Sequence, residues 1–414
     1  MRVTTKLAKT WVALAVISMS CGGAPKKDEA KLKEKASTTA MELGMKDAAL
    51  QDFQAAASEL SKAKPDNGKA IENLKRVVEA EPDFAEAHYN LGLLLVKLGD
   101  SALAETHLSK AHDLDPEILD YTVALGRAYA GNKKFDEAKI LFSEVVAREP
   151  NNLTAKNNLA VLAVNRGDIK DAMDTLEDIL RQDDSNVAAL NTLGLVYHKK
   201  GNLSLAKYMF NKALKVDKKN ADLHNNLGMV HMQEDHLPMA VKSFSKAIEV
   251  DPNYLESRLN LGAILLEYLD YGRADEQFTE AVRIAPSNCA GRLGRAATSY
   301  ALGRHQESAD GYLFYVDACN TKHVSSYERL AKLSESFLGK PKDAIGHYET
   351  LLTLVDSSEQ KTQYNAMINF LNSQLNPKAQ KTPEEEPEAD APGDDAGAED
   401  QPSEPAAAGD GESG

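Results

Sequence analysis

Three histidines are the residues best suited to chemistry in this sequence of 414 residues. His224, His231 and His236 are close in the sequence, and imidazoles are common ligands of transition metals. Motifs that identify enzymes are absent: there is no G-x-x-x-x-G-K-[ST] loop, no G-x-S-x-G elbow, no H-E-x-x-H and no C-x-x-C. We therefore expect no catalytic residue, no cofactor and no small-molecule substrate, and an enzyme ranks last among the classes of function.

The negative charge is concentrated at the C-terminus. Residues 382–414 include twelve acidic residues and five prolines but no Lys or Arg, within a chain of formal net charge −15. Such a segment cannot bury enough apolar surface to offset the entropy of ordering. We expect residues 377–414 to form a disordered acidic tail rich in Pro, Glu and Ala. The rest of the chain is nearly neutral, which argues against a nucleic-acid partner.

The N-terminus has the organisation of an export signal. Arg2, Lys6 and Lys9 precede a short apolar run at residues 11–17, and small residues follow up to Cys21. The run is too short to span a membrane. It resembles a bacterial lipoprotein signal, which implies that residues 1–20 are removed and that Cys21 is lipidated. The alternative is ordinary cleavage near Ser20.

The residue after the cysteine bears on the destination. Gly22 resembles the outer-membrane rather than the inner-membrane sorting signal of such lipoproteins. The resemblance implies a protein attached to the outer membrane by its lipid and facing the periplasm. Residues 21–48 are charged and favour helix, so we expect a spacer between the anchor and the folded part.

A period of 34 residues dominates the middle of the chain. An alanine recurs at that interval seven times, a Leu-Gly or Leu-Ala pair lies twelve residues before it from the second repeat on, and Leu or Phe lies four residues after it. The alanines are Ala70, Ala104, Ala138, Ala172, Ala206, Ala240 and Ala274. Glycine inside a helix costs about 1 kcal/mol relative to Ala, so its recurrence indicates close helix contacts.

This pattern resembles the tetratricopeptide repeat, which is a pair of antiparallel helices. The resemblance implies an all-α fold: a superhelical solenoid of about nine helix-turn-helix repeats over residues 51–358. Seven repeats are clear at 51–288, and two degenerate repeats follow at 290–358, the eighth displaced by one residue so that Ala309 and Leu313 replace the Ala and the Phe. Residues 359–376 are expected to form a capping helix.

The repeat pattern also bears on the histidines. His224 and His231 occupy first-helix positions where the family has large apolar residues. We therefore expect packed imidazoles and no metal site.

The first helices of such a solenoid line its concave face, where amide side chains recur. They are Asn90, Asn157, Asn158, Asn191, Asn225, Asn226 and Asn260, and an apolar stripe that includes Met229 and Met232 lies beside them. This arrangement resembles the asparagine ladder of O-GlcNAc transferase repeats, which implies a groove that binds a peptide backbone. The alternative is that asparagine simply tolerates the contact between helices at this position, as in many tetratricopeptide repeats, and the sequence leaves both open.

The two remaining cysteines form a candidate pair. Cys289 stands at the start of the eighth repeat and Cys319 near the end of its second helix, and these ends meet in an antiparallel pair. An exported protein with two thiols besides a lipidated cysteine is expected to form a disulfide. The alternative is two separate buried thiols.

These features together predict a scaffold that binds envelope proteins or peptides and contacts the membrane through its lipid. The chain resembles three groups of repeat-containing lipoproteins: pilotins of type IV pilus secretins, assembly factors of β-barrel proteins and gliding-motility lipoproteins. The number of repeats and residues 259–271 favour the gliding-motility group. The alternative is a general periplasmic peptide-binding adaptor that serves no dedicated machine.

Overall fold

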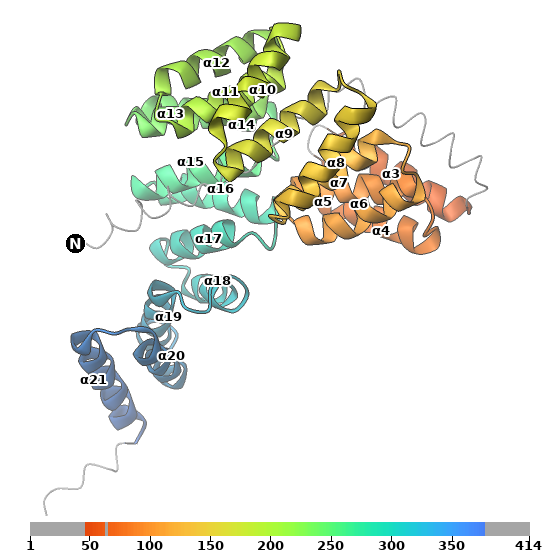
Figure 1. The fold of residues 1–414 in the computed structure, drawn as a ribbon. Coiled ribbons are helices and arrows are strands. Elements are labelled where there is room, and N and C mark those ends of the chain that lie inside the picture. The colour runs from red at the N-terminus through yellow and green to blue at the C-terminus, as the bar shows by residue number, and fades with distance from the viewer. Residues whose placement is uncertain (1–45, 63–64, 377–414) are drawn as a thin grey trace, which may run out of the picture.

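The computed structural model describes residues 46–62 and 65–376. The predicted signal, Cys21, most of the spacer and the acidic tail lie outside these residues. The described residues form nine helix pairs and one last helix, α21 (Ser358–Leu375), with no strand among them (Figure 1). The pairs are α3 (Asp47–Leu60) with α4 (Asn67–Ala80), α5 (Ala85–Lys97) with α6 (Ser101–Leu114), α7 (Leu119–Gly131) with α8 (Phe135–Arg148), α9 (Leu153–Arg166) with α10 (Ile169–Gln182), α11 (Val187–Lys199) with α12 (Leu203–Val216), α13 (Ala221–Gln233) with α14 (Leu237–Val250), α15 (Leu255–Glu267) with α16 (Tyr271–Ile284), α17 (Cys289–Ala301) with α18 (His305–Ala318), and α19 (Val324–Ser336) with α20 (Pro341–Leu354). The predicted all-α solenoid is confirmed.

The recurring small residues let the two helices of a pair approach closely. Gly194 of α11 faces Phe210 of α12, and a Cβ added at Gly194 would lie 2.4 Å from Cε1 of that ring. Phe210 and the repeat alanine Ala206 are fully buried. Since the interior is close-packed, the ring occupies the space that the missing Cβ leaves.

The prediction that the eighth repeat is displaced by one residue is wrong, because the eighth pair continues the 34-residue spacing of the pairs before it. Helix α17 starts 34 residues after α15, so Ser308 and Tyr312 take the places of the Ala and the Phe. Both are buried, whereas Leu313 is exposed. The Ser308 hydroxyl donates a hydrogen bond to the backbone carbonyl of Ala296 at 2.9 Å. A serine therefore fits the alanine position because its one polar atom is satisfied.

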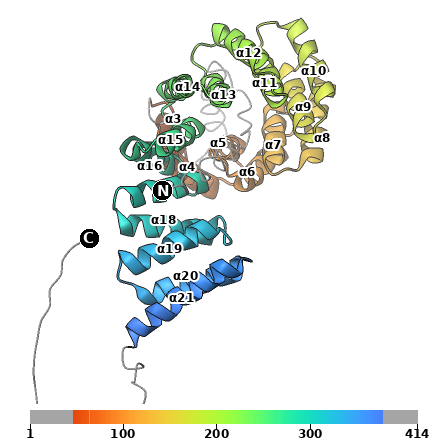
Figure 2. The same cartoon turned by 90° about the vertical axis from the view of Figure 1, so that its left-hand side faces the viewer.

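The solenoid completes a turn of its superhelix. Figure 2 shows α3 to α16 arranged in a ring, with α17 to α21 continuing away from it. Two contacts join segments far apart in the sequence: Asn253 Nδ2 donates to the carbonyl of Pro65 at 2.7 Å, and Lys97 Nζ lies 3.5 Å from Asp251 Oδ2. We call these four residues the seam. They close the ring between its first and its last pairs.

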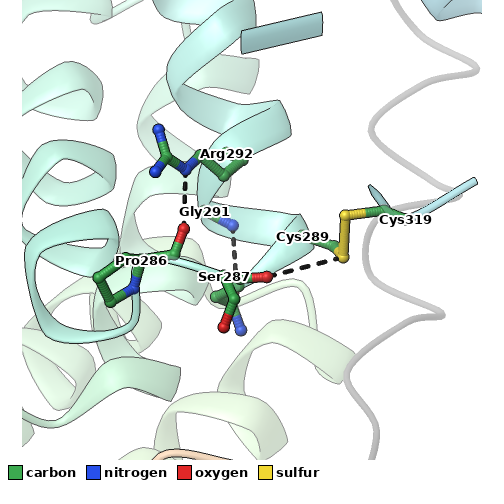
Figure 3. Close-up of a disulfide and its surroundings, with 7 residues drawn as sticks. Pro286, Ser287, Cys289, Gly291, Arg292 and Cys319 are labelled. Carbon is green, nitrogen blue, oxygen red and sulfur yellow. Dashed lines mark hydrogen bonds between the residues drawn. A yellow bond between two sulfur atoms is a disulfide. The ribbon is translucent and has the colours of Figure 1, made fainter. Parts of the chain in front are cut away.

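Cys289 and Cys319 are joined by a disulfide with a Cα–Cα distance of 5.8 Å (Figure 3). Cys289 begins α17, and Cys319 directly follows α18. The linker before α17 is held in place because Arg292 Nε donates to the Pro286 carbonyl at 2.8 Å. The bond ties the two ends of the eighth pair together where the ring gives way to the last helices.

None of the described helices combines the length and the apolar character needed to cross a membrane.

Candidate protein-binding channel

The ring encloses a channel with a cavity volume of about 2270 Å³. Its wall is built mainly from the first helices of successive pairs, because these face the inside of the superhelix. The helices α7, α9, α11, α13 and α15 contribute Ala124, Asn158, Leu195, Met229 and Asn260 respectively. The wall therefore combines apolar side chains with a few amides, a composition typical of binding sites.

Most amides of the predicted asparagine ladder form hydrogen bonds with other side chains of the protein. An amide oxygen on one first helix accepts a hydrogen bond from the side chain 35 residues later, on the next first helix. The bonded pairs are Asn157 with Thr192 at 2.9 Å, Asn191 with Asn226 at 2.8 Å and Asn225 with Asn260 at 3.1 Å. Asn157, Asn191 and Asn225 are all buried. At these positions the amides connect neighbouring helix pairs.

Asn158 differs from the other amides. Its side chain lines the channel and is only 2% exposed. Neither its Oδ1 nor its Nδ2 has a hydrogen-bond partner among the described residues. Leaving a buried polar group unpaired costs about 1–3 kcal/mol. Asn158 is thus the amide that has bonding capacity left for a ligand.

The channel contains only part of the predicted set. Asn158, Asn225, Asn226, Asn260 and Met229 line it. Asn90, Asn157, Asn191 and Met232 are not among its lining residues. Met232 packs instead against the core formed by α14 to α16.

The linkers between pairs also reach the channel, which an assignment based on first helices alone did not predict. Residues 216–222 and 250–256 line it and bring side chains of both charges, including Lys218 and Asp222. Tyr254 OH donates to Asp222 Oδ1 at 2.7 Å, which connects two of these linkers. Because the charges are mixed, the channel has no strong preference for the sign of a partner's charge.

Comparison with known proteins agrees with the helix-pair pattern. Models described as tetratricopeptide repeats match residues 63–99, 85–118, 129–193, 187–220 and 221–254. The chain is 34% identical over 83 residues to a UDP-N-acetylglucosamine–peptide N-acetylglucosaminyltransferase of Giardia intestinalis, covering 20% of this chain and 6% of that protein. It is 31% identical over 113 residues to trafficking protein particle complex subunit 12 of Mus musculus, covering 25% of this chain and 13% of that protein.

These matches thus span only a small part of either relative's length. Among solved structures, Pseudomonas aeruginosa PilF is similar, with 21% identity, 53% of this chain and 99% of that chain covered, and a TM-score of 0.46.

Three observations lead to one assignment. First helices recur at 34-residue spacing from α5 to α17, a buried alanine lies four residues before a buried Phe or Leu in the first seven pairs, and repeat models match along the ring. The chain belongs to the tetratricopeptide-repeat proteins.

Proposed function

We propose that this protein is a lipid-anchored scaffold that binds an extended segment of a partner protein in its channel and holds that partner at the outer membrane. Solenoids of this family present extended concave surfaces to other proteins. The observation that carries the proposal is Asn158, a buried and unpaired amide that faces a large channel. Its bonds can be completed by the backbone of a bound segment.

An extended polypeptide fits the chemistry of the wall. A carboxamide offers two donors and an acceptor, which complement the N–H and C=O groups of a peptide in any sequence. Met229 and Leu195 provide apolar contacts nearby, and Met adapts readily to different side chains. Recognition of backbone by amides, with apolar contacts for side chains, is a common way of binding extended peptides.

The proposed location depends on the N-terminal sequence. The basic residues, the short apolar run and Cys21 support attachment through lipid, and Gly22 supports the outer membrane. We propose that the partner belongs to an envelope machine of the gliding-motility or type IV pilus kind, supported by the resemblance of residues 259–271 and the number of repeats. To test the anchor, Cys21→Ser should move the protein from the membrane to the soluble fraction. If the variant still sedimented with membranes, attachment through a lipid on Cys21 would be rejected.

The channel is tested with two neighbouring asparagines. Once crosslinking and co-purification have identified a partner, Asn158→Ala should weaken its binding about twofold to tenfold, as expected for one lost hydrogen bond. The same change should leave the free energy of unfolding equal or slightly higher, because no internal bond is lost.

Asn157→Ala is the matched control. Its side chain bonds to Thr192 and does not line the channel, so its loss should lower stability by about 1 kcal/mol and leave binding unchanged. Equal binding by wild type and Asn158→Ala would reject the channel as the binding site. The co-purification also distinguishes the two candidate functions. One stoichiometric partner supports a scaffold of an envelope machine, and many unrelated peptides support a general adaptor.

A further inference from the structure

The turn between α13 and α14 brings two of its own side chains close to a side chain of α13. The backbone N–H of His236 donates to the carbonyl of His231 at 2.8 Å, and Asp235 between them has a left-handed φ of 60°. The same backbone bond closes the turns of the neighbouring pairs, joining Asn202 to Tyr197 and Asp270 to Leu265. The fold therefore holds these two positions at a fixed separation in successive repeats. Among the described turns closed in this way, this one carries imidazoles at both positions.

Glu234 completes a converging set of three side chains. Its Oε2 lies 3.5 Å from Nδ1 of His231 and 3.4 Å from Nδ1 of His236. One ligand atom from each of the three residues lies within 4.8 Å of those of the other two. In a tetrahedral zinc site with bonds of about 2.1 Å, ligand atoms are about 3.4 Å apart. The two measured distances match that spacing.

The inner atoms of this set are buried and face one another. His231 Nδ1 and Glu234 Oε2 make no hydrogen bond with any described residue, although the side chains are only 14% and 16% exposed. The other carboxylate oxygen, Oε1, accepts a hydrogen bond from Lys207 Nζ at 2.6 Å. Lys207 thus fixes the orientation of the carboxylate and leaves Oε2 directed at the imidazoles. Buried atoms of this kind normally have a partner.

We propose that His231, Glu234 and His236 bind one divalent transition-metal ion, with Zn²⁺ the best match to the ligand set and spacing. Two imidazoles and one carboxylate leave a fourth position of a tetrahedral ion for water or a partner's side chain. His236 is 63% exposed, so the ion can reach the site from solvent. The sequence analysis predicted no metal site because His224 and His231 occupy packing positions of the repeat. In the structure the third member of the cluster is Glu234 and not His224, whose Nε2 lies 3.4 Å from the Lys218 carbonyl.

The bound ion would join two helices beside the channel. His231 belongs to α13, whose Met229 lines the channel, and His236 caps α14. Metal binding therefore stabilises this pair. The chain also folds without the ion, because backbone hydrogen bonds already close the turn.

The test is calorimetric titration of the purified full-length protein, carrying no histidine tag, with Zn²⁺ alone. We expect saturable uptake of one ion per chain and a higher melting temperature in its presence. His236→Ala should weaken the affinity about tenfold or more. The side chain of His236 is exposed and makes no capping bond with described residues, so this variant should fold normally. Co²⁺ in place of Zn²⁺ should give the strong visible absorption of a tetrahedral site in wild type but not in His236→Ala.

Two further variants sharpen the result. His224→Ala removes a histidine from the same helix and should bind Zn²⁺ as wild type does. Lys207→Met removes the hydrogen bond that orients the Glu234 carboxylate and should weaken Zn²⁺ binding. Absence of saturable uptake, equal affinity in wild type and His236→Ala, or loss of binding in His224→Ala would each overturn the assignment.

Discussion

At the scale of single residues, a pair of histidines makes stability depend on pH: His88 is buried and His107 is half-buried. Nδ1 of His88 and Nδ1 of His107 lie 3.1 Å apart between α5 and α6. Burial lowers the pKa of both imidazoles, and His88 further lowers that of His107. Burial lowers the pKa of His198, His323 and His347 in the same direction.

We predict that the free energy of unfolding falls as the pH is lowered from about 7.5 to about 5.5. In the unfolded chain these imidazoles take up protons near their ordinary pKa of 6.5, whereas in the folded chain they do so only at lower pH. The unfolded state therefore binds more protons in this window, and acid favours it. Urea titrations at the two pH values measure the change. Stability that is constant or higher at the lower pH would contradict the prediction.

Neighbouring residues also show what a sequence can and cannot assign. Asn157 and Asn158 are adjacent and chemically identical, yet one bonds to Thr192 while the other faces the channel unpaired. Consecutive positions on a helix differ by about 100° in direction, so their roles depend on the rotation of α9 against its neighbours. The periodic pattern placed both on the concave side. It could not separate them, because that rotation is set by packing.

At the scale of helix pairs, the contact between glycine and phenylalanine is a coupled unit. The fourth pair offers a natural comparison: Ala160 stands at the glycine position of α9, and Leu176 replaces the ring on α10. Both are buried. With the smaller Leu176 on the second helix, the first helix thus accommodates the methyl group of Ala160.

We predict that Gly194→Ala destabilises the protein by about 1–2 kcal/mol, although alanine is the better helix former by about 1 kcal/mol. The new Cβ would lie 2.4 Å from the ring of Phe210, which is fully buried and cannot move aside. Adding Phe210→Leu should recover part of the loss, so the two changes together cost less than their sum. A double-mutant cycle by chemical denaturation measures this coupling. Strict additivity would show that the close contact does not matter.

The pairs differ in how well the sequence predicted them. From α5 to α16 the alanine, glycine and aromatic positions recur in one register, so the helices follow the expected pattern. In the eighth pair the register was misplaced by one residue, because Ser308 stands where the pattern requires alanine. A serine there is acceptable only with the backbone bond to Ala296, which a sequence pattern does not reveal.

At the scale of the whole molecule, the seam decides whether the channel is closed. Superhelical curvature is the sum of small rotations from pair to pair, and no local motif encodes that sum. The contact between Pro65 and Asn253, 188 residues apart, therefore could not be anticipated from the repeats. Asn253 is 3% exposed, and its Oδ1 accepts from Arg283 Nη2 at 2.7 Å while its Nδ2 reaches Pro65.

We predict that Asn253→Ala opens the ring and increases the radius of gyration measured by small-angle X-ray scattering. The remaining seam contact, between Lys97 and Asp251, is a half-exposed ion pair that contributes about 0–1 kcal/mol. It cannot hold the ring closed alone. Asn186→Ala is the control: it removes a helix cap on α11 without touching the seam, and should leave the radius unchanged. Identical scattering of wild type and Asn253→Ala would show that packing along the solenoid is sufficient for closure.

The disulfide has a mechanical consequence for a solenoid. When such a chain is pulled from its two ends, helix pairs can detach one after another, because each pair contacts mainly its neighbours. The bond between Cys289 and Cys319 spans 30 positions, and tension cannot pass along the chain between them. At about 3.6 Å per extended residue, roughly 100 Å of contour length stays hidden from the pulling force. Under tension the molecule therefore extends in two parts, one on each side of the disulfide, while the segment between the two cysteines does not lengthen.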